Sequence, residues 1–251
     1  MVKLIKYEWR KQKTSRMVIL VMLAVGIIAY IYGLLFNNNI AGICMVLMFC
    51  GAVLVLFYTG IESIIVLNRD LRTRQSYMMW MVPKSVWEIL GAKFISAILQ
   101  MLFAFAIFFA AGCVCVGIAI AESGGIRAIV EAVQEFIRIG LEIEVSWVDL
   151  IMFAVYFFVG WVEIIFIGFL SVLMSRTVLI RSRFAGLVAV ILFFVVNFIV
   201  EQGYSLMYRI PGIHGADLAG GWNPWDIVYY VVIALVVFGI SGWIADRKLS
   251  V

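Results

Sequence analysis

Six long apolar runs, separated by polar stretches, constrain the fold of this 251-residue chain more than any other feature. Crossing a bilayer as a helix takes about 17–25 apolar residues. With 65% hydrophobic and 14% charged residues, the chain has too much apolar surface to bury in one soluble core. We therefore predict an all-α integral membrane protein, a single transmembrane domain over residues 1–251 with six spans: Met17–Phe36, Ile40–Leu67, Phe94–Ala121, Val148–Met174, Phe184–Val200 and Ile227–Ala245.

The basic residues lie mostly on one side of these spans. Sixteen of the 19 Lys and Arg residues fall in the N-terminal arm, the Asn68–Lys93 loop, the Ser175–Arg183 loop and the C-terminal tail. Because cytoplasmic loops carry an excess of Lys and Arg, we predict that both termini and these two loops are cytoplasmic. The charge then reports topology and contact with membrane lipids, and we predict no nucleic-acid partner.

Three segments outside the spans have patterns of their own. Val2–Arg16 is basic with an apolar face, which predicts an N-terminal interfacial helix, although a positive flank without a helix fits the same residues. Ile126–Ile139 carries an apolar stripe at helical spacing, which predicts an outer amphipathic helix, either a plain lid or a gate or docking face for cargo. Gln202–Trp225 holds two prolines and five glycines, which argues against a long continuous helix there.

Few polar side chains fall inside the predicted spans. Glu62 lies near the cytoplasmic end of the second span, Glu163 near the middle of the fourth and Asn197 in the fifth. A carboxylate at membrane depth is costly and usually faces the bundle interior or a water-filled cavity. One interpretation is that these residues line a substrate path. The other is that each is held by a neighbouring helix and has only a structural role.

Known catalytic motifs are missing from the sequence. It contains no G-x-x-x-x-G-K-[ST] phosphate loop, and its single His excludes H-E-x-x-H and other paired-His motifs. It also contains no G-x-S-x-G. We therefore predict that the chain is not an enzyme and has neither a cofactor nor a metal site of its own.

The Asn68–Phe94 segment combines positive charge with large apolar side chains. It carries five basic residues together with Tyr77, Met78, Met79, Trp80, Met81, Val82 and Trp87. A solvated linker would not need so many apolar side chains. This composition predicts a segment that lies along the membrane surface or docks on a partner.

Within this segment, Met81–Lys93 resembles the second-to-third loop of permease subunits of type-2 ATP-binding-cassette exporters. Val82-Pro83-Lys84-Ser85 and Gly91-Ala92-Lys93 match the pattern of that family, in which an aliphatic residue and a proline precede a small residue shortly before Lys. The basic arm and the six spans are similar as well. The chain departs from the family at Arg72–Ser76, where members often have an acidic residue and a Gly-Thr pair.

The resemblance implies a permease subunit in a bacterial cytoplasmic membrane, paired with a second copy or a homologue around a path for a peptide, a lipid-like molecule or a drug. ATP and Mg would bind to separate cytoplasmic ATPase subunits. A membrane immunity or sensing protein without transport, or a secondary transporter, remains an alternative. The implied ATPase-coupling residues, on a cytoplasmic coupling helix, are Arg72, Arg74, Gln75, Tyr77, Met79, Trp80, Pro83 and Lys84.

Overall fold

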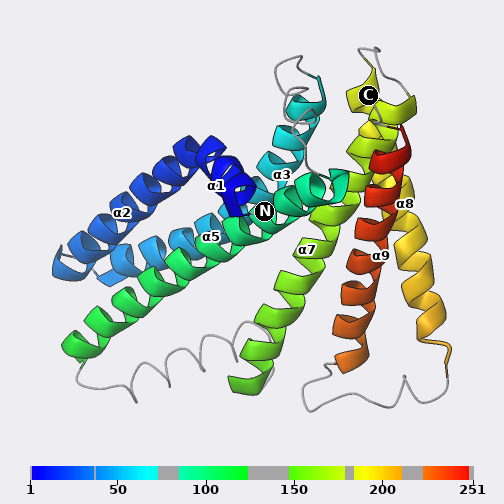
Figure 1. Cartoon of the computed structure of the whole chain (residues 1–251). Coiled ribbons are helices and arrows are strands. Elements are labelled where there is room, and N and C mark those ends of the chain that lie inside the picture. The colour runs from blue at the N-terminus through cyan, green and yellow to red at the C-terminus, as the bar shows by residue number, and fades with distance from the viewer. Residues whose placement is uncertain are drawn as a thin grey trace. The chain divides into compact units, whose positions relative to one another are not determined.

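The computed structural model describes residues 2–36, 38–72, 85–123, 147–178, 184–210 and 223–248. Over these residues the chain forms helices and no strand (Figure 1). Six of the helices are long and apolar enough to cross a membrane. The predicted all-α fold of a multi-pass membrane protein is confirmed. The helices are α1 (Val2–Lys11), α2 (Lys13–Phe36), α3 (Asn38–Arg72), α5 (Val86–Ser123), α7 (Trp147–Val178), α8 (Ala185–Met207) and α9 (Pro224–Lys248).

The helices on either side of the basic segment extend further than predicted. α3 continues past Leu67 to Arg72, and α5 begins at Val86 rather than at Phe94. The length of an apolar run reflects contact with lipid, whereas the hydrogen-bonded helix can continue past the end of that run. The Asn68–Lys93 loop was therefore predicted too long. The outer amphipathic helix that was predicted over Ile126–Ile139 lies outside the described residues. Of the segment predicted to contain the coupling helix, only the flanks are described.

The predicted Gln202–Trp225 loop is also too long at both ends. α8 runs to Met207, and α9 begins at Pro224. The start of α9 has a local cause, because the side-chain Oδ1 of Asn223 accepts a hydrogen bond from the backbone N–H of Trp225 at 3.0 Å. Asn is a favoured N-cap residue, and Pro suits the first position of a helix, where no N–H is needed.

The described helices form two compact units, and each is described by itself. One unit contains α1, α2, the part of α3 up to Thr59, and the part of α5 from Ser96 onward. Its core includes Tyr30, whose hydroxyl donates to the backbone carbonyl of Cys115 at 3.3 Å, and Ala41. The predicted single domain over residues 1–251 stays a prediction.

In this unit the N-terminal helix is shorter than predicted, because α1 ends at Lys11 and Lys13–Arg16 belongs to α2. The ring of Trp9 packs edge-on against Phe103 of α5, with ring centroids 5.6 Å apart. The guanidinium of Arg16 lies over the Trp9 ring and donates to Gln100 at 3.2 Å. α1 is thus anchored to α5 by aromatic and cationic contacts. A position of α1 at a membrane interface stays a prediction.

The other unit contains Gly60–Ile95 and residues from Ser146 to the C-terminus. α7 is the central helix of this unit, because 61% of the residues in its most apolar stretch are buried. In the other five long helices the corresponding share is 17–22%. α8 and α9 pack on α7 (Figure 1). Phe94 of α5 lies among three other aromatic rings of this unit, at centroid distances of 4.2–5.0 Å: Phe166, Phe169 and Phe238.

Candidate functional site: the loop base and a tyrosine cluster

The residues predicted to contact an ATPase lie at the edge of the described part of the chain. Arg72 is the last residue of α3, and its side chain is outside the described residues. The other seven lie outside them altogether: Arg74, Gln75, Tyr77, Met79, Trp80, Pro83 and Lys84. Their contact with an ATPase stays a prediction. The structure describes only the two flanks of residues 73–84, which are the end of α3 and the start of α5.

A buried ion pair joins these two flanks. The ammonium Nζ of Lys93 on α5 donates to the carboxylate Oδ2 of Asp70 on α3, and the two side chains are only 4% and 5% exposed. Ser63, Leu67 and Asp70 follow helical spacing and are all buried. The pair therefore lies on the inward face of α3 and ties the end of α3 to the start of α5.

Three further hydrogen bonds extend this connection to α7 and α8. The guanidinium of Arg176, near the end of α7, donates to the side-chain oxygen of Asn68 through Nε at 3.0 Å and through Nη2 at 2.6 Å. The hydroxyl of Ser175 donates to the backbone carbonyl of Ala185 at the start of α8. We call Asn68, Asp70, Lys93 and Arg176 the loop base.

The loop base changes the interpretation of two residues. Lys93, which matches the exporter-permease pattern, was expected in the loop and instead is buried in an ion pair. Arg176 was expected in the short cytoplasmic loop Ser175–Arg183, but it lies in α7 and holds α3. Both residues therefore make contacts within the chain itself, since their charged groups are engaged by its own side chains.

The three predicted path residues have different surroundings. Glu62 of α3 and Asn197 of α8 are partly exposed, whereas Glu163 of α7 is buried, with 3% of its surface exposed. One carboxylate oxygen of Glu163, Oε1, has no hydrogen-bond partner within the described part of the chain. The lining of a path by these three residues stays a prediction.

The unit built on α7 also contains a set of five tyrosines that the sequence analysis did not single out as a site. We call Tyr156 of α7, Tyr204 of α8, Tyr208 at the C-cap of α8, and Tyr229 and Tyr230 of α9 the tyrosine cluster. Five pairs of rings have centroids 5.1–5.8 Å apart, and these pairs join all five residues. The distances are typical of interacting aromatic side chains.

Hydrogen bonds fix part of this cluster. The hydroxyl of Tyr208 donates to the carboxylate of Asp226 at 2.9 Å, and the hydroxyl of Tyr229 donates to the backbone carbonyl of Val200 at 2.6 Å. Asp226 lies in the first turn of α9 and is buried. These bonds join the C-terminal end of α8 to α9.

A helical spacing in the sequence indicates this cluster. Asn197, Glu201, Tyr204 and Tyr208 recur at i, i+4, i+7 and i+11, which places them on one side of a helix. The pattern was missed because the second half of it was assigned to the glycine-rich loop. Gly203, which supported that assignment, is a packing residue: a Cβ there would lie 2.6 Å from the hydroxyl oxygen of Tyr229.

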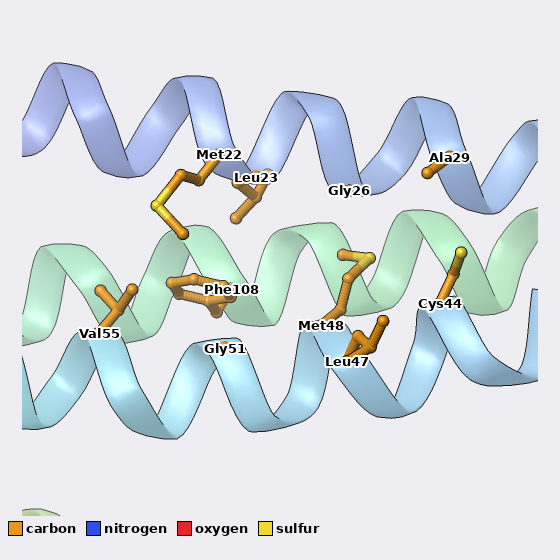
Figure 2. Close-up of a pocket in the computed structure, with 10 residues that line it drawn as sticks. All are labelled: Met22, Leu23, Gly26, Ala29, Cys44, Leu47, Met48, Gly51, Val55 and Phe108. Carbon is orange, nitrogen blue, oxygen red and sulfur yellow. The ribbon is translucent and has the colours of Figure 1, made fainter.

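The unit formed around α2 has a hollow of its own. It measures about 180 Å³ and lies among α2, α3 and α5 (Figure 2). Its walls are apolar, and Gly26 and Gly51 widen it because they carry no side chain. Met22, Met48 and Phe108 point into this space in the close-up. An apolar chain or ring matches this lining, and no charged side chain contributes to it.

Comparisons with known proteins add nothing to this geometry: no protein-family model, no curated protein and no solved structure matches the chain.

Proposed function

We propose that this chain is the permease subunit of an ATP-driven exporter and that residues 73–84 couple it to separate cytoplasmic ATPase subunits. The proposal starts from a multi-pass membrane protein whose basic, aromatic segment resembles the coupling loop of type-2 exporter permeases. ATP and Mg would be held by the ATPases. The cargo would be hydrophobic or amphipathic, and a second copy of the chain, or a homologue, would complete the path.

The observation that carries the proposal is the loop base. A segment that passes force from an ATPase to the spans needs both of its ends fastened, because a loose end would absorb the displacement. Asp70 and Lys93 fasten α3 to α5 on the two sides of residues 73–84. Asn68 and Arg176 continue the connection to α7, the central helix of this unit.

The residue types of the segment fit a docking surface. Protein interfaces obtain most of their binding energy from a few buried anchors, among which Trp is enriched, and methionine adapts to irregular apolar surfaces. Trp80 and Met79 are the apolar anchors that we propose. Arg72 and Arg74 would set the register of docking, since surface ion pairs contribute only about 0–1 kcal/mol.

The test is co-purification of the chain with an ATPase encoded by a neighbouring gene, followed by ATPase assays in lipid nanodiscs. We expect Trp80→Ala and Met79→Asp to reduce cargo-dependent ATP turnover more than Arg72→Ala does. Trp243→Ala is the matched control, because it makes the same substitution at an exposed tryptophan of α9. The proposal is wrong if no ATPase co-purifies, or if Trp80→Ala and Met79→Asp change neither assembly nor turnover.

A further inference from the structure

The hollow among α2, α3 and α5 lies at membrane depth. Gly26, which lines it, is the fourteenth of the 24 residues of α2. At 1.5 Å per residue, the two ends of the helix are about 15 and 20 Å away from this glycine. The hydrocarbon core of a bilayer is about 30 Å thick, so Gly26 lies close to its middle. A ligand of the hollow therefore reaches it from among the lipid chains.

The walls of the hollow favour a ligand without polar groups. They carry no charged, hydroxyl or amide side chain, and the most polar group among them is the free thiol of Cys44. A free Cys behaves as a small hydrophobe. Burying a headgroup or a charged cargo without a hydrogen-bond partner is costly. Only the apolar part of a ligand is therefore expected to enter.

The shape of the hollow distinguishes between a chain and a ring. Its lining runs from Met22 to Ala29 on α2 and from Cys44 to Val55 on α3, which corresponds to about 10 and 16 Å along the helix axes. Figure 2 shows these residues spread along the two helices. A compact cavity of roughly 150 Å³ holds one benzene ring, whereas here about 180 Å³ extends over this whole length. The space is long and narrow, which suits an unbranched hydrocarbon chain.

The hollow is open to lipid along its rim. Met22 and Leu47 are 59% and 64% exposed, whereas Val55 is buried. Atoms that line an unfilled space lose dispersion contacts on one side, and an apolar cavity is not filled by water. Met22 and Met48 have flexible thioether side chains that adapt to the group they contact. An acyl chain from the surrounding bilayer can restore these contacts without leaving the hydrocarbon.

We propose that this hollow is a binding site for one unbranched acyl chain of a membrane lipid, with the headgroup outside it. Lipid chains are as apolar as Leu, so burial from water provides no preference for the site. Selectivity comes from fit instead, because an unbranched chain fills the slot and a chain with methyl branches is too thick for it. The proposal does not depend on the exporter function, because lipid binding needs no ATPase.

Two glycines of α3 supply a matched pair of variants. Gly51 lines the hollow, and nothing lies within 4 Å of a Cβ placed there. Gly42 is equally open to a Cβ but does not line the hollow. Gly51→Leu is therefore expected to fill part of the slot without displacing the backbone, and Gly42→Leu makes the same change outside it.

The test is photolabelling of the full chain in nanodiscs with a phosphatidylglycerol that carries a diazirine in one unbranched acyl chain, followed by mass spectrometry. The host lipid is either diphytanoyl phosphatidylglycerol, whose chains are branched, or palmitoyl-oleoyl phosphatidylglycerol, whose chains are not. We expect labelling of residues 22–29 and 44–55 to saturate with the probe in the branched host. It should fall severalfold in the unbranched host, which competes for the slot. Labelling at the exposed Phe198 of α8 reports ordinary lipid contact and should rise in proportion to the probe in both hosts.

In the branched host, Gly51→Leu is expected to reduce labelling of the hollow severalfold, whereas Gly42→Leu leaves it unchanged. The comparison of the two hosts uses the unmodified chain, so it tests the proposal even if Gly51→Leu fails to fold. The proposal is wrong if the hollow and Phe198 respond alike to the two hosts, or if folded Gly51→Leu labels like Gly42→Leu. It is also wrong if toluene, a single ring, reduces the labelling and the unbranched host does not. Absence of label from the hollow in both hosts would mean that a second copy or another segment covers it, which overturns the proposal as well.

Discussion

Replacing Lys93 by methionine tests the loop base directly. The substitution keeps most of the side-chain volume and removes the charge, so the carboxylate of Asp70 is left buried without its cation. Both side chains are about 95% buried, so solvent cannot replace the lost partner. Breaking a buried ion pair by removing one partner costs about 3–5 kcal/mol.

This cost should be visible as a lower thermal stability. For a chain of this size, a change of 1 kcal/mol shifts the melting temperature by about 2–4 °C, so we expect Lys93→Met to lower it by roughly 6–20 °C. The assay is thermal melting of the purified chain in lipid nanodiscs, followed by tryptophan fluorescence. Lys3→Met is the matched control, because Lys3 is exposed on α1, and changes at exposed positions usually stay within about 0.5 kcal/mol.

A double variant distinguishes the ion pair from a general packing effect. In Asp70→Leu/Lys93→Met both charges are replaced by apolar groups, and such replacements of buried pairs are often neutral or stabilising. We therefore expect the double variant to melt well above Lys93→Met. The reasoning is refuted if Lys93→Met melts like the unmodified chain, or if the double variant is as unstable as the two single variants combined.

Two more predictions test the packing of α9 and the topology. A Cβ at Gly242 would overlap the ring of Trp87, whereas nothing lies within 4 Å of one at Gly239. Gly242→Ala should therefore lower the melting temperature by several degrees, while Gly239→Ala should raise it slightly, because Ala favours a helix by about 1 kcal/mol; equal effects would contradict the packing. Single cysteines at Thr73 or Ser182, in a cysteine-free background, should react with impermeant reagents only from the cytoplasmic side, and labelling from outside alone would invert the topology.

The sequence predicted the six long helices because the thickness of a bilayer sets their length. Runs such as Val148–Met174 are too apolar and too long for any other place in a protein. The ends of the helices were less predictable, because hydropathy records contact with lipid and not the last backbone hydrogen bond. α3 continues to Arg72 and α5 begins at Val86, so both helices extend beyond the apolar runs that were assigned to the spans.

The candidate sites were harder to predict, for two different reasons. Asp70 and Lys93 are separated by a long segment, and nothing in a single sequence indicates that an acid before a loop will pair with a lysine after it. The tyrosine cluster did have a signal, the spacing of Glu201, Tyr204 and Tyr208 on one side of a helix. That signal was overruled by the glycines and prolines that follow, and Gly203 was counted as a helix breaker although it packs against Tyr229.

The loop base and the buried carboxyl group of Glu163 are connected through α7. Arg176, near one end of this helix, is bonded to α3 at the loop base, and Glu163 lies 13 residues earlier in the same helix, about 20 Å along its axis. Between them, the buried ring of Phe94 packs against Phe166 and Phe169 of α7. A close-packed interior transmits small displacements because it contains few voids. If an ATPase displaced residues 73–84, the displacement would therefore act first on α3 and α5, then through Asn68 and Arg176 on α7, and through α7 on α8 and α9, which pack on it.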